Sequence, residues 1–492
     1  MIDPVAEAAG IDEVLEHSRR GTRQFLIARV CVLICGFLVT AILTRALAPS
    51  DYGIYVVVMS ILLWLEMLGH AGVPGAIAKL IADNRHDPDQ VERSARAFLL
   101  GFAVLLLACC WVLAPYVANV MNIPNGAVLF RVAIIDLPFA AIFTSYDGVL
   151  TGHRQFGVLA AIHLIYGITK LAGVIALISL GFSVERVLMV FVLSTCLVCA
   201  VLTFRYRPSG FQPRGAIIKD IVLITAPISI YLILGQVLLN LDLWALKSLW
   251  KGGGEVVGYY AASMNLARIL MIVPGAQAAV LFTSIAWAVA SRETTRAQRH
   301  IREASRFAVI IAAAAWIGLG LNASEILSVL FSSSYAEGQR FLRFQLVGFG
   351  FFALLDAYSH ALMAAGRQWP VAGGLLVTAV LVGLSNFLLI PRLGPIGAAI
   401  SMVFGTAAGA VIIGSMAYHH FGSLVDLTTL FRVSVAAVVA CVANVILQVS
   451  GPVVIVKVAI LGGLYLLVLY LLGEITTKDF GFSMKRAADR SA

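Results

Sequence analysis

The chain has 492 residues, of which 60% are hydrophobic and only 12% are charged, and its formal net charge is +9. Together with a mean hydropathy of +0.94, this composition excludes a water-soluble globular domain and predicts a polytopic membrane protein. A surface that faces anionic lipid explains the positive charge better than nucleic-acid binding, which we do not expect.

Residues 1–24 contain no apolar core of the kind that a cleavable signal peptide needs. We expect them to form a short cytoplasmic amphipathic helix that leads into the first membrane span.

Fourteen apolar runs follow, each long enough to cross a membrane, because a helical span needs about 20 mostly apolar residues. Some of them are broken by Pro or Gly, so twelve spans are the alternative. The alternating strands of a membrane barrel are absent, so the predicted fold is an all-α polytopic bundle of about 14 transmembrane helices. The runs lie at 25–46, 52–72, 97–120, 128–150, 157–180, 183–204, 221–246, 256–288, 307–331, 342–365, 369–391, 394–418, 430–450 and 452–474.

Pro138, Pro227 and Pro274 fall inside spans 4, 7 and 8. Because proline removes a backbone donor and clashes with the preceding turn, we expect these spans to be interrupted there.

The distribution of Lys and Arg predicts the orientation. With the N-terminus inside, the cytoplasmic segments contain 23 of them and the outer segments contain nine. Cations near the ends of the other spans are counted with the adjoining segments, and Arg29, Lys170 and Arg268 are counted within spans and complete the total of 35. The bias predicts that both termini are cytoplasmic.

Two stretches of the chain repeat each other at an offset of 213 residues. Leu150–Val158 and Met363–Val371 share an Arg-Gln pair, and the same offset places Leu180-Gly181 on Leu393-Gly394. A further pair of motifs, Gly53-Ile-Tyr55 and Gly258-Tyr-Tyr260, is 205 residues apart. Such a repeat is typical of transporters in which two similar halves form a central site that opens to alternate sides.

The predicted architecture is therefore two repeated six-helix lobes around a central cavity, plus two C-terminal helices. The corresponding segments are 1–24 (cytoplasmic), 25–210 (N-lobe, spans 1–6), 211–420 (C-lobe, spans 7–12), 421–475 (spans 13–14) and 476–492 (cytoplasmic tail).

Charged residues inside the spans are the candidates for a functional site, because each costs about 2.5–3.5 kcal/mol at the bilayer centre. The alternative for each of them is structural pairing with a neighbouring helix, and Arg29 is also close enough to the cytoplasmic end of its span to reach the interface. The candidate substrate-binding residues are Arg29, Lys170, Arg268, Asp242, Asp136, Glu66 and Asp356.

Because the spans contain both cations and carboxylates, the sequence does not decide the charge of the substrate. Three cations favour an anionic group such as a phosphate or pyrophosphate, whereas carboxylates favour cationic drugs or coupling ions.

We expect no metal, cofactor or catalytic site. Cys196 and Cys199 have the spacing of a metal-binding pair, but no second pair accompanies them. Every predicted outer loop is short, and no cluster of acid and base residues is evident.

The stretch Arg45–Tyr55, Arg-Ala-Leu-Ala-Pro-Ser-Asp-Tyr-Gly-Ile-Tyr, resembles the first hairpin of bacterial polysaccharide flippases. His70–Lys79 resembles the end of their second span, and Asn240–Asp242, Gly258–Arg268 and the two Arg-Gln turns are further similarities. The resemblance covers roughly residues 20–420 and identifies the chain as a member of the multidrug/oligosaccharidyl-lipid/polysaccharide exporter superfamily.

The resemblance implies that the protein flips an undecaprenyl-pyrophosphate-linked oligosaccharide across the bacterial cytoplasmic (inner) membrane by alternating access. The resemblance also implies that cations in the lumen hold the pyrophosphate, as in relatives, and Arg29 and Arg268 match that role by position, Lys170 less closely. The implied partners are the lipid-linked substrate, the bilayer, and a polysaccharide polymerase with its chain-length proteins.

Two rivals belong to the same superfamily, namely a multidrug/cation antiporter and a lipid II flippase. A third rival, a membrane-bound glycan polymerase or ligase, needs acid and base residues at the outer face.

Overall fold

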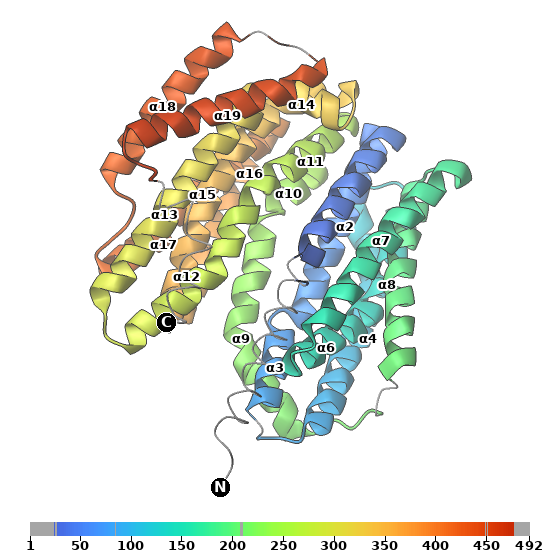
Figure 1. Ribbon diagram of the computed structural model, residues 1–492. Coiled ribbons are helices and arrows are strands. Elements are labelled where there is room, and N and C mark those ends of the chain that lie inside the picture. Colours follow the sequence, from blue (N-terminus) through green and yellow to red (C-terminus); the bar gives the residue numbers. More distant parts are fainter. Residues whose placement is uncertain are drawn as a thin grey trace. The chain divides into compact units, whose positions relative to one another are not determined.

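The computed structural model describes residues 24, 27–83, 85–206, 210–447, 449 and 451–476. Every regular element in these residues is a helix (Figure 1). The amphipathic helix expected in residues 1–24 and the tail at 476–492 lie outside the described residues, apart from Gln24 and Thr476.

The described residues contain fourteen candidate membrane spans, which confirms the predicted all-α, fourteen-span fold. The first span is Ile27–Ala46. The α-helices after it are α2 (Pro49–His70), α3 (Val73–Ala82), α4 (Pro88–Val120), α5 (Gly126–Ile134), α6 (Asp136–Gly152), α7 (Phe156–Leu180), α8 (Val184–Tyr206), α9 (Gly215–Leu238), α10 (Leu241–Leu249), α11 (Glu255–Ala267), α12 (Ile272–Ala290), α13 (Thr294–Ala315), α14 (Ala323–Leu330), α15 (Gln339–Ala364), α16 (Gln368–Leu393), α17 (Pro395–Phe421), α18 (Leu427–Ile446) and α19 (Val454–Leu471).

Several spans consist of two helices joined by a break. Span 4 breaks between α5 and α6 at Ile135, and span 8 breaks at a 3-10 turn, Arg268–Met271, between α11 and α12. Pro138 and Pro274 lie in the first turn after these breaks, where a missing backbone donor costs nothing. The interruption predicted at Pro227 is wrong, because α9 continues through it.

The helices group into two compact units. The first contains residues 1–240 and 253–258, and the second contains residues 241–252 and 259–492. Helix α9 groups with the first unit by its contacts, whereas the repeat assigns this span to the second half. Contacts and sequence repeats measure different properties, so the repeat boundary at residue 210 stays a prediction.

Small residues bring the helices of the first unit close together. On α6, Gly148 and Gly152 are four residues apart and face Ile77 and Ile81 of α3. A Cβ atom at either glycine would come within about 3.0 Å of these isoleucines. This small-xxx-small spacing is how membrane helices gain packing energy without help from the hydrophobic effect.

The second unit uses the same spacing on α17. There Gly405 faces Val382, and Gly409 faces Thr378 of α16 and Leu355 of α15. A Cβ atom at Gly405 would lie 2.1 Å from the Val382 side chain, so only glycine fits this close approach.

The last two spans pack against α13. Buried residues of α18 and α19, including Ala436, Leu461 and Leu469, form one apolar cluster with Ile310 and Ile317. The Tyr465 hydroxyl donates to the Ile310 carbonyl oxygen at 3.1 Å, which satisfies its polar end in an apolar environment.

The repeated Arg-Gln motif forms the same turn twice, with a shift of one residue. Arg154 and Gly366 have left-handed backbones, with φ of 57° and 79°. The residue after each of them, Gln155 or Arg367, donates to the carbonyl oxygen five residues earlier, at 2.8 and 2.9 Å. The equivalent positions are therefore 212 residues apart, one fewer than the offset obtained by matching the Arg-Gln letters.

Candidate functional site

A cluster of three predicted site residues lies in the first unit. Glu66 is on α2, Asp136 begins α6, and Lys170 is on α7. The two carboxyl groups interact electrostatically with each other and with the Lys170 ammonium. Asp136 is 7% exposed, and its position in the first turn of α6 places its charge at the favourable end of the helix dipole.

The Lys170 ammonium lies between aromatic rings. Its Nζ is 4.2 Å from the centre of the Phe191 ring and 4.5 Å from that of Tyr166, and Tyr55 packs edge-on against Phe191. Cation–π contacts hold a cation in place without using its hydrogen-bond donors. Within the part of the chain that the structure describes, no carboxylate comes within ion-pair distance of Lys170. Its donors are therefore available to an anionic ligand.

A second cluster lies in the second unit around Asp242, which is only 1% exposed near the start of α10. The Tyr260 hydroxyl of α11 donates to Asp242 Oδ2, and the Gln345 amide of α15 donates to the Tyr260 carbonyl oxygen at 3.2 Å. Three helices are thus tied together by a buried polar network, which is costly to leave partly satisfied.

Arg268 begins the 3-10 turn that breaks span 8, and its charge interacts with that of Asp242. Its Nη2 also contacts the Met264 sulfur at 3.7 Å. A thioether is a weak acceptor, so this contact positions the guanidinium without neutralising it. The arginine thus stands where α11 ends, and its side chain is half-buried.

Replacing Tyr260 with phenylalanine is expected to destabilise the protein by about 1–3 kcal/mol, because the Asp242 carboxyl would lose its donor in a buried site. The measurement is thermal unfolding of the purified protein in detergent. Tyr116→Phe is the matched control, since Tyr116 is 68% exposed on α4. An equal effect of the two substitutions would contradict the proposed role of Tyr260.

The remaining predicted residues lie elsewhere within their units. Asp356 is on α15 and pairs with His360 at 3.5 Å, with 15% of its side chain exposed. Arg29 is exposed in the first turn of the first span. The structure thus groups Glu66 with Asp136 and Lys170, and Asp242 with Arg268.

Several residues of these clusters were not among the predicted site residues. Phe191 and Gln345 carry no sequence signal, because uncharged residues of these types are common in membrane helices. Tyr166 did carry one, since it precedes Lys170 by four residues on the same helix. Tyr260 did carry one, since it ends the repeated Gly258-Tyr-Tyr260 motif.

The sequence matches the model of the polysaccharide biosynthesis protein family over residues 19–283. It is also 23% identical over 306 residues to the succinoglycan biosynthesis transport protein ExoT of Rhizobium meliloti (strain 1021). That match covers 61% of this chain and 60% of the relative, so the chain spans about three fifths of the relative's length.

Solved structures of transporters share the fold. The lipid II flippase MurJ, in an inward closed conformation, matches with a TM-score of 0.76 and 12% identity over 93% of this chain and 99% of that one. An inward-facing multidrug resistance MATE family transporter of the MOP superfamily matches with a TM-score of 0.65 and 17% identity, covering 78% and 93% of the two chains. At these identities the similarity establishes the fold alone.

Proposed function

The chain belongs to the polysaccharide biosynthesis protein family, within the multidrug/oligosaccharidyl-lipid/polysaccharide exporter superfamily, and from this premise we propose that it is a lipid-linked oligosaccharide flippase. The substrate that we propose is an undecaprenyl-pyrophosphate-linked repeat unit of a surface polysaccharide, moved across the bacterial inner membrane by alternating access. A polysaccharide polymerase and chain-length proteins would then act on the product. The protein itself would form no covalent bond.

The observation that carries this proposal is the state of Lys170, an ammonium held by two aromatic rings with its donors unused. Transferring a pyrophosphate into hydrocarbon without compensation costs tens of kcal/mol by Born solvation. Charge-assisted hydrogen bonds from Lys170 and Arg268 would replace part of the lost hydration. The prenyl tail can remain in lipid throughout, because it is apolar.

The carboxyl groups support a second role beside the cations. We propose that Glu66 and Asp136 in the first unit, and Asp242 in the second, balance the cations when no substrate is bound, because each interacts electrostatically with Lys170 or Arg268. Such balance lowers the cost of keeping Lys170 and Arg268 inside the membrane between transport cycles. We propose that these acids, with Asp356, line the substrate path, and that Arg29 attracts the anionic headgroup at the entrance.

A genetic test separates this function from its rivals. Cells that lack the protein are expected to lose surface polysaccharide and to accumulate its lipid-linked precursor, while remaining viable and normally sensitive to cationic drugs. Rescue of cells depleted of their lipid II flippase would instead indicate the cell-wall precursor as substrate. Increased drug sensitivity with intact polysaccharide would indicate a drug antiporter.

The orientation that we propose, with both termini in the cytoplasm, predicts opposite labelling of two exposed serines. In a variant whose seven cysteines have been replaced, Ser333→Cys is expected to react with an impermeant maleimide in intact spheroplasts. Ser291→Cys, on the connection between α12 and α13, should react only after permeabilisation. The reverse pattern would contradict the charge-based topology.

A further inference from the structure

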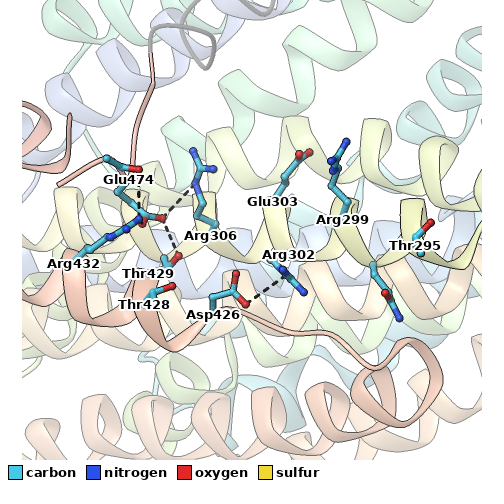
Figure 2. Close-up of a pocket in the computed structure, with 12 residues that line it drawn as sticks. Thr295, Arg299, Arg302, Glu303, Arg306, Asp426, Thr428, Thr429, Arg432 and Glu474 are labelled. Atoms are coloured by element: carbon cyan, nitrogen blue, oxygen red, sulfur yellow. Dashed lines mark hydrogen bonds and ion pairs between the residues drawn. The ribbon is translucent and has the colours of Figure 1, made fainter. Parts of the chain in front are cut away.

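A charged pocket of about 480 Å³ lies in the second unit, at the start of α13 and α18 and just after the end of α19 (Figure 2). Four arginines and three carboxylates line it, so its formal charge is +1. The arginines are Arg299, Arg302, Arg306 and Arg432. None of the residues that line this pocket belongs to the clusters around Lys170 and Asp242.

The inner part of the pocket is organised by Glu474, whose side chain is 3% exposed. Its carboxylate accepts hydrogen bonds from Thr429 at 2.8 Å and Arg432 at 3.0 Å, and it pairs with Arg306 at 3.5 Å. One carboxylate thus meets two guanidinium groups from different helices. Arg306, Arg432 and Glu474 together carry a formal charge of +1.

The outer part is more open. Arg302 pairs with Asp426 at 3.5 Å, with about half of each side chain exposed. Arg299 has neither an ion pair nor a hydrogen bond among the residues that the structure describes. In Figure 2, Arg299, Glu303 and Arg306 project from one side of α13, whereas Arg302 projects towards Asp426. Glu303 in turn pairs with His300 at 3.9 Å. The Arg299 guanidinium is therefore available to bind an anion.

Exposed apolar side chains adjoin the pocket. Leu427 and Phe431 on α18 are 81% and 69% exposed, and they neighbour the pocket residues Thr428 and Arg432 in the chain. Leu471, at the end of α19, is 73% exposed. These helices are membrane spans and the pocket is at their ends, which is the level of lipid headgroups. The surroundings therefore suit a ligand with an anionic head and apolar tails.

We propose that this pocket binds the phosphate headgroup of an anionic phospholipid. Arg299 and Arg302 bind the phosphate oxygens, because a guanidinium matches phosphate geometry with two parallel donors. The acyl chains lie along Leu427 and Phe431. The ion pairs of Glu474 with Arg306 and Arg432 hold α13 and α18 at the spacing that the headgroup needs.

The test is lipid binding to the full-length purified protein, measured by native mass spectrometry during titration with phosphatidylglycerol or phosphatidylcholine. The pocket variant is Arg299→Gln/Arg302→Gln. The matched control, Arg292→Gln/Arg296→Gln, removes the same charge from the same basic segment but outside the pocket lining. Thermal unfolding shows whether each variant is folded, and Arg299→Glu replaces the double variant if that is unstable.

The expected result is that phosphatidylglycerol binds roughly tenfold more weakly to the pocket variant than to wild type and to the control. Glu303→Gln should bind it about threefold more tightly, because a nearby negative charge is removed. Equal loss in the pocket and control variants would overturn the site. Saturable binding of glycerol 1-phosphate that displaces the lipid would show that the site takes a soluble phosphate, and would overturn the lipid assignment.

Discussion

Removing the cation in either cluster is expected to reduce translocation of the lipid-linked oligosaccharide by roughly tenfold to a hundredfold. The variants are Lys170→Ala in the first unit and Arg268→Ala in the second. Each would remove charge-assisted hydrogen bonds to the pyrophosphate, which are the strongest contacts that these side chains can offer. Translocation is measured in proteoliposomes as the loss of a fluorescent headgroup from one leaflet.

Matched controls separate loss of the site from general loss of charge. Lys219→Ala changes an exposed lysine near the start of α9, and Arg340→Ala changes an arginine whose side chain is 63% exposed. Both controls should translocate at the wild-type rate. Conservative replacement by Lys170→Arg should retain more activity than the alanine variant, since the charge is kept. Wild-type rates in both alanine variants would refute the assignment of these cations to the substrate.

Replacing Gly258 with alanine is expected to destabilise the protein by about 3 kcal/mol or more. A Cβ atom at Gly258 would lie 1.8 Å from the Pro49 carbonyl oxygen, and one at Gly53 would lie 2.8 Å from the Gly258 nitrogen. These neighbours are backbone atoms, which cannot rotate away as a side chain can. Both glycines belong to the repeated Gly-x-Tyr motif, so this close approach explains why both copies contain glycine.

The control for this substitution is Gly101→Ala on α4. A Cβ atom there meets no atom within 4 Å, and alanine is the better helix former by about 1 kcal/mol. Thermal unfolding should therefore show a large loss for Gly258→Ala and no loss for Gly101→Ala. A Gly258→Ala protein as stable as wild type would mean that α2 can shift without penalty.

The number and type of the spans could be predicted because membrane helices must satisfy their own backbone and cover about 30 Å of hydrocarbon. The breaks within spans were harder to place. Pro138 and Pro274 do follow breaks, but α9 accommodates Pro227 and continues. A proline only removes one donor, and the surrounding packing decides whether the helix ends.

The offset between the two copies of the repeat could also not be predicted fully from the sequence. Matching the two Arg-Gln pairs gives an offset of 213, whereas the left-handed residues of the two turns, Arg154 and Gly366, give 212. Backbone conformation, and not side-chain identity, is what the two turns share. An arginine at a left-handed position is unusual, so the sequence offered no reason to align it with a glycine.

The charged residues of the candidate site could be predicted from the sequence, but most of the residues that contact them could not. Lys170 and Arg268 stand out because a charge in a membrane span is rare. Tyr166 and Met264 lie four residues before Lys170 and Arg268, so helical spacing could indicate them. Phe191 and Asp242 come from other helices, and no local pattern in the sequence indicates that they will face the cations. Glu474 was overlooked for a related reason, since it lies at the end of the last span and resembles an ordinary solvated residue until Arg306 and Arg432 are seen beside it.

The most direct test of the central claim is leaflet translocation of a fluorescent prenyl-pyrophosphate oligosaccharide by the purified wild-type protein in proteoliposomes. The account predicts translocation that depends on the protein, that falls in the Lys170→Ala and Arg268→Ala variants, and that a prenyl-pyrophosphate without sugar inhibits by competition. If the folded wild-type protein moves no such lipid, whatever its glycan, while it exchanges cationic drugs across the same membranes, the flippase account is contradicted.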